Sequence, residues 1–106
     1  MEQICLIYST FPDRKQAEDI AKELVRQRLI ACANIMGQAT SVYEWNQTLC
    51  TEEEVPVIFK TRQSMVSAIQ DVLSELHPYS VPCILEFHAD SANEAFHSWI
   101  FQQTGP

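Results

Sequence analysis

The sequence predicts an α+β fold in which the elements follow the order β-α-β-β-α-β and end in one further helix. Short apolar runs rich in β-favouring residues alternate with longer segments whose apolar residues recur every three to four positions. The chain has 106 residues, which is enough for one domain and not for two. Two split β-α-β units of this length form a ferredoxin-like sandwich, with two helices on one face of an antiparallel sheet.

The first strand and the first helix are separated by a sharp break. Residues 4–8 form a continuous apolar run, which is typical of a buried central strand. Pro12 follows, and Asp13 is placed to cap a helix, with Gln16 as its capping-box partner. The helix is expected to end near Arg28. Its apolar face consists of Ala17, Ile20, Ala21, Leu24 and Val25.

The middle of the chain predicts two adjacent strands. Residues 31–45 are expected to form one long strand with a bulge or bend at Met36-Gly37. Residues 46–51 are expected to form a polar turn, and the alternating residues 55–62 form the third strand. Because Pro56 cannot donate a backbone hydrogen bond, the start of that strand is expected at a sheet edge.

The last third of the chain predicts a helix, a strand and a short helix. The second helix is marked by Met65, Ile69, Val72 and Leu76. His77-Pro78 ends it, and a fourth strand covers residues 84–87. Ser91 and Glu94 form an S-x-x-E capping box for a terminal helix. That helix carries Phe96, Trp99 and Ile100.

Composition excludes several classes of function. The 14 acidic and 7 basic side chains give a net charge of −7, which repels phosphates and disfavours nucleic-acid binding. No signal peptide or membrane-spanning stretch is predicted, so we expect a cytoplasmic protein without a membrane partner. The four cysteines contain no C-x-x-C pair, which excludes a zinc knuckle and a thioredoxin-type motif. They are expected to be reduced.

No catalytic constellation is visible. Neither H-E-x-x-H nor G-x-S-x-G occurs, and no serine has an evident histidine partner. We therefore expect a protein that is not an enzyme.

Three groups of residues have both a structural and a functional interpretation. The aromatic residues Tyr43, Trp45 and Tyr79 suit a subunit interface, with a small-molecule pocket as the alternative. The acidic run 52–54 suits a solvated turn, with a weak cation site as the alternative. His77 suits a helix C-terminus, where a cationic imidazole is favourable, with a ligand role as the alternative.

Six runs of the chain, taken together and in order, resemble the CutA family of divalent-cation tolerance proteins. They are residues 9–13 (STFPD), 28–34 (RLIACAN), 40–45 (TSVYEW), 54–62 (EVPVIFKTR), 77–82 (HPYSVP) and Trp99. The resemblance implies a single CutA-like domain over residues 1–106, assembled as a ferredoxin-like homotrimer whose long hairpin pairs with neighbouring subunits. It also implies a role in the response to divalent metal ions, copper above all.

The residues themselves also favour assembly. The second strand carries Val42 on one face and Tyr43 and Trp45 on the other, and the third strand places Ile58 opposite Phe59. Both faces of the sheet therefore need cover, whereas one chain supplies helices for one face only. The second face is expected to meet other subunits of a homotrimer.

The resemblance also implies a possible copper-binding site. In some family members copper is assigned to three positions that are Ser9, Leu76 and Cys83 in this chain. A hydroxyl and an isobutyl group are not useful copper ligands, whereas a thiolate suits Cu(I). The candidate metal ligands are therefore Cys83 and His77, which lie at the two ends of a proline-containing turn. Copper is the one candidate cofactor.

Two other functions stay open at this point. The first is a trimeric signalling or scaffold protein that binds a small molecule or a partner protein in clefts between subunits, by analogy with PII-type trimers of the same fold. The second is a small hydrolase related by fold to the acylphosphatases. That class needs an anion-cradling loop after the first strand, and residues 13–15 offer basic side chains without glycine.

Overall fold

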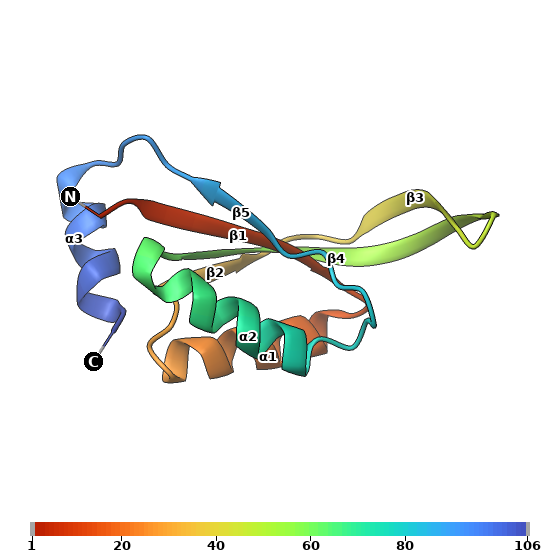
Figure 1. The fold of residues 1–106 in the computed structure, drawn as a ribbon, viewed down its shortest axis with the longest axis horizontal. Coiled ribbons are helices and arrows are strands. Elements are labelled where there is room, and N and C mark those ends of the chain that lie inside the picture. The colour runs from red at the N-terminus through yellow and green to blue at the C-terminus, as the bar shows by residue number, and fades with distance from the viewer. Residues whose placement is uncertain (1, 106) are drawn as a thin grey trace.

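The computed structural model describes residues 2–105 and has the predicted α+β architecture (Figure 1). Its elements are β1 (Ile4–Phe11), α1 (Arg14–Arg26), β2 (Cys32–Ile35), β3 (Ala39–Trp45), β4 (Thr48–Arg62), a 3-10 turn (Gln63–Met65), α2 (Val66–Leu76), β5 (Leu85–His88) and α3 (Glu94–Gln103). The strands pair antiparallel in the order β2-β4-β1-β5, and β3 pairs with the first half of β4. This is the arrangement that split β-α-β units produce.

Helices α1 and α2 lie across one face of the sheet (Figure 1). Each helix buries one apolar stripe, because its apolar residues recur at helical spacing. The stripes consist of Ala17, Ile20, Ala21 and Leu24 in α1 and of Val66, Ile69 and Leu73 in α2. They meet alternate residues of the central strands: Cys5, Ile7, Phe11, Val55, Val57 and Phe59. The main core therefore lies between this one sheet face and the two helices.

The helix starts agree only in part with the sequence. The Asp13 side chain accepts a 2.8 Å hydrogen bond from the backbone N–H of Gln16, as predicted for an N-cap. The predicted box of Ser91 and Glu94 is wrong, because the N-cap of α3 is Asn93 and its side chain makes no capping hydrogen bond. Tertiary packing fixes α3 instead: it buries Ile100 in a small second cluster with Ile4 and Ala31. Within residues 2–105, no helix is long and apolar enough to cross a bilayer.

The long second strand is split where a bend was expected. Residues 36–38 separate β2 from β3. Pro56 lies opposite this break, in the interior of β4, and its prediction as an edge residue is wrong. The Pro56 carbonyl accepts a 2.9 Å hydrogen bond from the Met36 N–H. Since the N–H and C=O of one strand residue point the same way, the missing donor of Pro56 faces the gap in the neighbouring strand.

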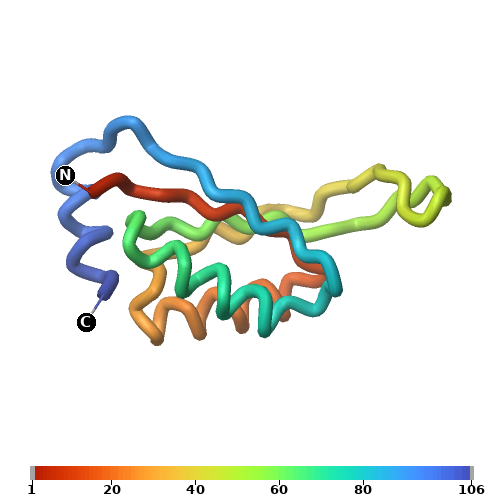
Figure 2. Tube along the Cα trace, in the orientation of Figure 1, coloured from red at the N-terminus to blue at the C-terminus, as the bar shows by residue number. Residues whose placement is uncertain are grey.

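The whole molecule measures 46 × 26 × 23 Å. The β3–β4 hairpin extends well beyond the rest of the fold (Figure 2). The polar turn predicted over residues 46–51 is shorter than expected. Trp45 pairs with Thr48, so only Asn46 and Gln47 form the turn, with φ of 51° and 63°. Positive φ at both central residues belongs to the tight hairpin turn whose twist matches the strands.

The face of the sheet opposite α1 and α2 is largely uncovered. Leu6, Tyr8 and Ile58 are partly exposed on it, whereas Leu85 and Phe87 on β5 are 49% and 54% exposed. Helix α3 reaches only the end of the sheet (Figure 1). A contiguous apolar surface of this kind marks an interaction site in a soluble protein.

Candidate functional site

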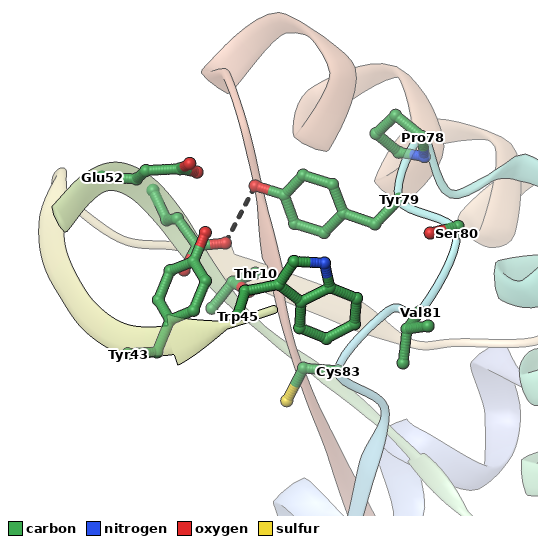
Figure 3. Close-up of a pocket in the computed structure, with 10 residues that line it drawn as sticks. Thr10, Tyr43, Trp45, Glu52, Pro78, Tyr79, Ser80, Val81 and Cys83 are labelled. Atoms are coloured by element: carbon green, nitrogen blue, oxygen red, sulfur yellow. Dashed lines mark hydrogen bonds between the residues drawn. The ribbon is translucent and has the colours of Figure 1, made fainter. Parts of the chain in front are cut away.

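A cavity of about 500 Å³ lies where the β3–β4 hairpin leaves the sheet, against the loop between α2 and β5 (Figure 3). We call it the hairpin cavity. Its lining combines aromatic rings, carboxylates and a thiol: Thr10, Tyr43, Trp45, Glu52, Glu54, Pro78, Tyr79, Ser80, Val81 and Cys83. The predicted aromatic set therefore comes together in one place, with two acidic residues among the rings.

Strand alternation explains why these side chains meet. Tyr43 and Trp45 occupy alternate positions of β3, so both point to one face. In the paired strand β4, Glu52 and Glu54 share that face, and the intervening Glu53 accepts a hydrogen bond from Thr40 instead. The prediction that residues 52–54 form a turn is wrong, because they lie inside β4. Alternate spacing of the two carboxylates was the signal in the sequence that could have revealed their common direction.

The loop and the hairpin are tied together inside the cavity. The Tyr79 hydroxyl donates a 2.9 Å hydrogen bond to Glu54, which is the dashed contact in Figure 3. Burial, followed by this contact with the carboxylate, raises the pKa of Tyr79 above its ordinary value. Burial also raises the pKa of Glu54, but hydrogen bonding by Ser41, Tyr79 and Thr10 outweighs it, so the net shift is downward. Glu54 therefore carries a negative charge at neutral pH.

His77 lies behind the cavity wall and is buried. Its Nδ1 accepts a 3.1 Å hydrogen bond from the Tyr79 N–H, so Nε2 carries the proton and donates to the Thr10 carbonyl at 2.8 Å. The ring also stacks on Phe11, with centroids 4.4 Å apart. His77 thus fastens the start of the loop to β1. Metal ligation by His77 would require one of these two hydrogen bonds to break.

The burial of His77 predicts a pH dependence of stability. Burial lowers the pKa of His77 from its ordinary value of 6.5, although the Thr10 carbonyl and the Glu54 charge act in the opposite direction. The unfolded imidazole therefore takes up a proton first, and stability is lost as the pH falls below about 6.5 through the folded pKa. Denaturant unfolding between about pH 7 and pH 5 should show this slope, and the slope should flatten in His77→Gln. An unchanged slope in that variant would contradict the assignment.

The three positions to which the family resemblance directs a copper site do not come together in this chain. Cys83 lines the hairpin cavity, Leu76 is 46% exposed at the end of α2, and Ser9 is fully buried on the helix-covered face. Burial, and then the charge of Glu54, raises the pKa of the Cys83 thiol. Cys83 is therefore protonated at neutral pH until a metal or another electrophile displaces the proton.

Comparison with known proteins identifies the family. A family model described as the CutA1 divalent ion tolerance protein matches residues 5–103. The divalent-cation tolerance protein CutA of Pyrococcus horikoshii is 37% identical over 99 residues, which cover 93% of this chain and 96% of the relative. Human protein CutA is 35% identical over 97 residues, which cover 92% of this chain and 54% of the longer relative.

Solved structures agree with these relatives. The crystal structure of the divalent ion tolerance protein CutA1 from Ehrlichia chaffeensis matches with a TM-score of 0.96 and 34% identity, covering 100% of this chain and 99% of the other. The resemblance carried by the six sequence runs is confirmed, and so is the ferredoxin-like fold that it implies. The chain belongs to the CutA1 divalent ion tolerance protein family.

Proposed function

We propose that this divalent-cation tolerance protein binds copper or a similar divalent cation weakly in the hairpin cavity. The observation that carries the proposal is that Glu52, Glu54 and Cys83 all line one cavity, which places two carboxylates and a thiol around the same space. Carboxylate oxygens suit Cu(II), and a thiolate suits Cu(I). The net charge of −7 raises the local concentration of cations near such a surface.

The same geometry explains why the binding should be weak. Glu54 already accepts a hydrogen bond from Tyr79, and both ring nitrogens of His77 have partners. A metal that recruits either side chain must first break one of these contacts. The role of His77 as a ligand beside Cys83 is accordingly proposed as secondary to its role in holding the loop.

We also propose that the protein is a homotrimer. The uncovered sheet face with Leu85 and Phe87 supports this, because one chain leaves it exposed to water. The hairpin supports it as well, since its two strands extend away from the body of their own chain (Figure 2). The unfolding midpoint should therefore rise with protein concentration.

Titration with copper tests the cation site. Cu(II) should bind the parent protein weakly, and Glu52→Gln and Cys83→Ser should each reduce the affinity by roughly tenfold, about 1.4 kcal/mol. Glu53→Gln is the matched control, because Glu53 neighbours both acids but lies on the other face of β4. Isothermal titration of the four proteins checks this. Tight binding abolished by His77→Ala alone, with Glu52→Gln unchanged, would overturn the proposed ligand set.

A second candidate function is the binding of a small organic cation or a partner's cationic side chain in the same cavity. It is favoured by the aromatic rings of Tyr43, Trp45 and Tyr79, which line the same cavity as the two carboxylates. Aromatic faces attract cations within about 6 Å of the ring centroid. A metabolite that raises the melting temperature of the parent, but not of Trp45→Leu, would place this function ahead of metal binding.

The expected cytoplasmic location is likewise a proposal. It is supported by the cysteines at positions 5, 32, 50 and 83, which are free thiols in the described chain, as in a reducing compartment. Cell fractionation checks it, and recovery of the protein outside the cytoplasm would contradict it.

A further inference from the structure

A second group of potential metal ligands lies at the other edge of the sheet, away from the hairpin cavity. Cys5 on β1 and Glu86 and His88 on β5 bring a sulfur, a carboxylate oxygen and a ring nitrogen within 4.8 Å of one another. We propose that these three residues form a binding site for a zinc-class divalent cation. The site does not depend on the cation site of the hairpin cavity or on the trimer.

Strand register brings the three side chains together. Cys5 pairs directly with His88, and Ile7 pairs with Glu86, so the two β5 residues lie on the same side of the sheet as the Cys5 thiol. This is the helix-covered side. Leu85 and Phe87 alternate with them and point to the uncovered face. Covering that apolar face in an assembly therefore leaves the ligand group on the opposite side.

The donor set matches one class of ion. Thiolate, imidazole and carboxylate are the three protein ligands that Zn²⁺ uses, whereas Mg²⁺ and Ca²⁺ take oxygen alone. Ligand atoms around a tetrahedral zinc lie roughly 3.3–3.8 Å apart, given bond lengths of about 2.0–2.3 Å. The three ligand atoms lie within 4.8 Å of one another, and His88 Nε2 already contacts the Glu86 carboxylate, so side-chain rotations of these two residues set the spacing around an ion. Both side chains are partly exposed, so an ion in solution can reach them.

Gln63 holds two of the ligands in place. The Cys5 thiol donates to Gln63 Oε1 at 3.3 Å, and Gln63 Nε2 lies 3.4 Å from the Glu86 carboxylate. The Gln63 N–H is fixed in turn by a 3.0 Å hydrogen bond to the Gln3 carbonyl. Outer partners of this kind orient metal ligands in known sites. Water or the Gln63 side-chain oxygen is available for the fourth position.

Without a metal, the Cys5 thiol proton and the contact between His88 and Glu86 occupy the space in which an ion would bind. The thiol of Cys5 is protonated and donates to Gln63, and the His88 Nε2 contacts the Glu86 carboxylate. A divalent ion between these groups takes the place of the thiol proton and of the contact between His88 and Glu86. The alternative is that His88 and Glu86 only interact with each other beside the buried Cys5 thiol, and that the group has no affinity for metal.

Cobalt is the probe that separates these alternatives. Metal-free protein is titrated with Co(II) under reducing conditions while its absorption spectrum is recorded. We expect one ion per chain, a thiolate-to-cobalt charge-transfer band, and the visible bands of a tetrahedral ion. Zn(II) should then displace the cobalt. Absence of a thiolate band would overturn the proposal.

Two variants and one control assign the site. His88→Ala changes a half-exposed side chain, so the fold should persist and the cobalt affinity should fall by roughly tenfold or more. Glu86→Gln should act in the same direction. Cys83→Ser is the matched control, because it removes the thiol of the hairpin cavity and should leave the bands unchanged. Loss of the bands in Cys83→Ser, or an unchanged cobalt affinity in His88→Ala, would refute the assignment. The copper titration is then repeated in His88→Ala. Unchanged copper binding shows that the hairpin cavity acts independently of the Cys5, Glu86 and His88 group, so one site can fail while the other holds.

Discussion

Replacing Phe87 with glutamate is expected to convert the proposed homotrimer into monomers. Phe87 is 54% exposed in the single chain and lies beside Leu85 on the uncovered sheet face. Burial of a phenylalanine stabilises an interface by about 1.5–3 kcal/mol per side chain, and the variant also places a charge where water is excluded. Three symmetry-related copies multiply the effect in each particle. Sedimentation equilibrium at micromolar concentration measures the change in mass.

A matched control separates assembly from general damage. Val25→Glu makes the same kind of change at a residue that is 45% exposed on α1, on the opposite side of the molecule. It should leave the particle mass unchanged. A parent protein that is already monomeric, or a Phe87→Glu variant that remains trimeric, would contradict the proposed interface. Assembly also predicts that the melting temperature of the parent, but not of Phe87→Glu, depends on protein concentration.

Replacing His77 with alanine is expected to destabilise the fold by about 2–4 kcal/mol. The change removes a buried ring that stacks on Phe11. It also leaves the Thr10 carbonyl and the Tyr79 N–H without their partners. The loop that forms one wall of the hairpin cavity would lose its attachment to β1. Denaturant unfolding monitored by circular dichroism measures the loss.

The neighbouring Leu76→Ala is the control for this variant. Leu76 is 46% exposed at the end of α2, so its truncation should cost only about 0.5–1 kcal/mol. It also occupies one of the three positions to which the family resemblance directs a copper site. A His77→Ala protein of unchanged stability that no longer binds copper would show that His77 is a ligand rather than a structural anchor.

Local sequence patterns were sufficient for the order of the elements. Helical spacing identified both main helices, the Asp13 cap marked the start of α1, and the bend at Met36-Gly37 separates β2 from β3 as expected. These features depend on residues close together in the chain, whose periodicity and turn chemistry are visible without knowledge of the fold. The same periodicity showed that both sheet faces are apolar. The six ordered runs were specific enough to indicate the family.

Features that depend on which strands pair could not be predicted in this way. Pro56 is tolerated in a central strand only because the gap between β2 and β3 lies opposite it. Glu52 and Glu54 line the same cavity as the aromatic rings because β4 begins at Thr48, earlier than the composition of residues 48–54 suggests. An acidic run has low strand propensity, and cross-strand pairing with β3 outweighs it.

The sequence by itself determined an α+β fold of the CutA1 family with apolar residues on both faces of its sheet. The tertiary structure alone showed that Glu52 and Glu54 share a cavity with the predicted aromatic residues, and it alone brought Cys5, Glu86 and His88 together. The His77 ring contacts the Thr10 carbonyl and so anchors the loop that follows α2. This role becomes visible only when the hydrogen-bond partners of the two ring nitrogens are known. Cys5 and His88 come from opposite ends of the chain and meet through the register of β1 with β5. Register is set by the packing of whole strands, and no local pattern encodes it.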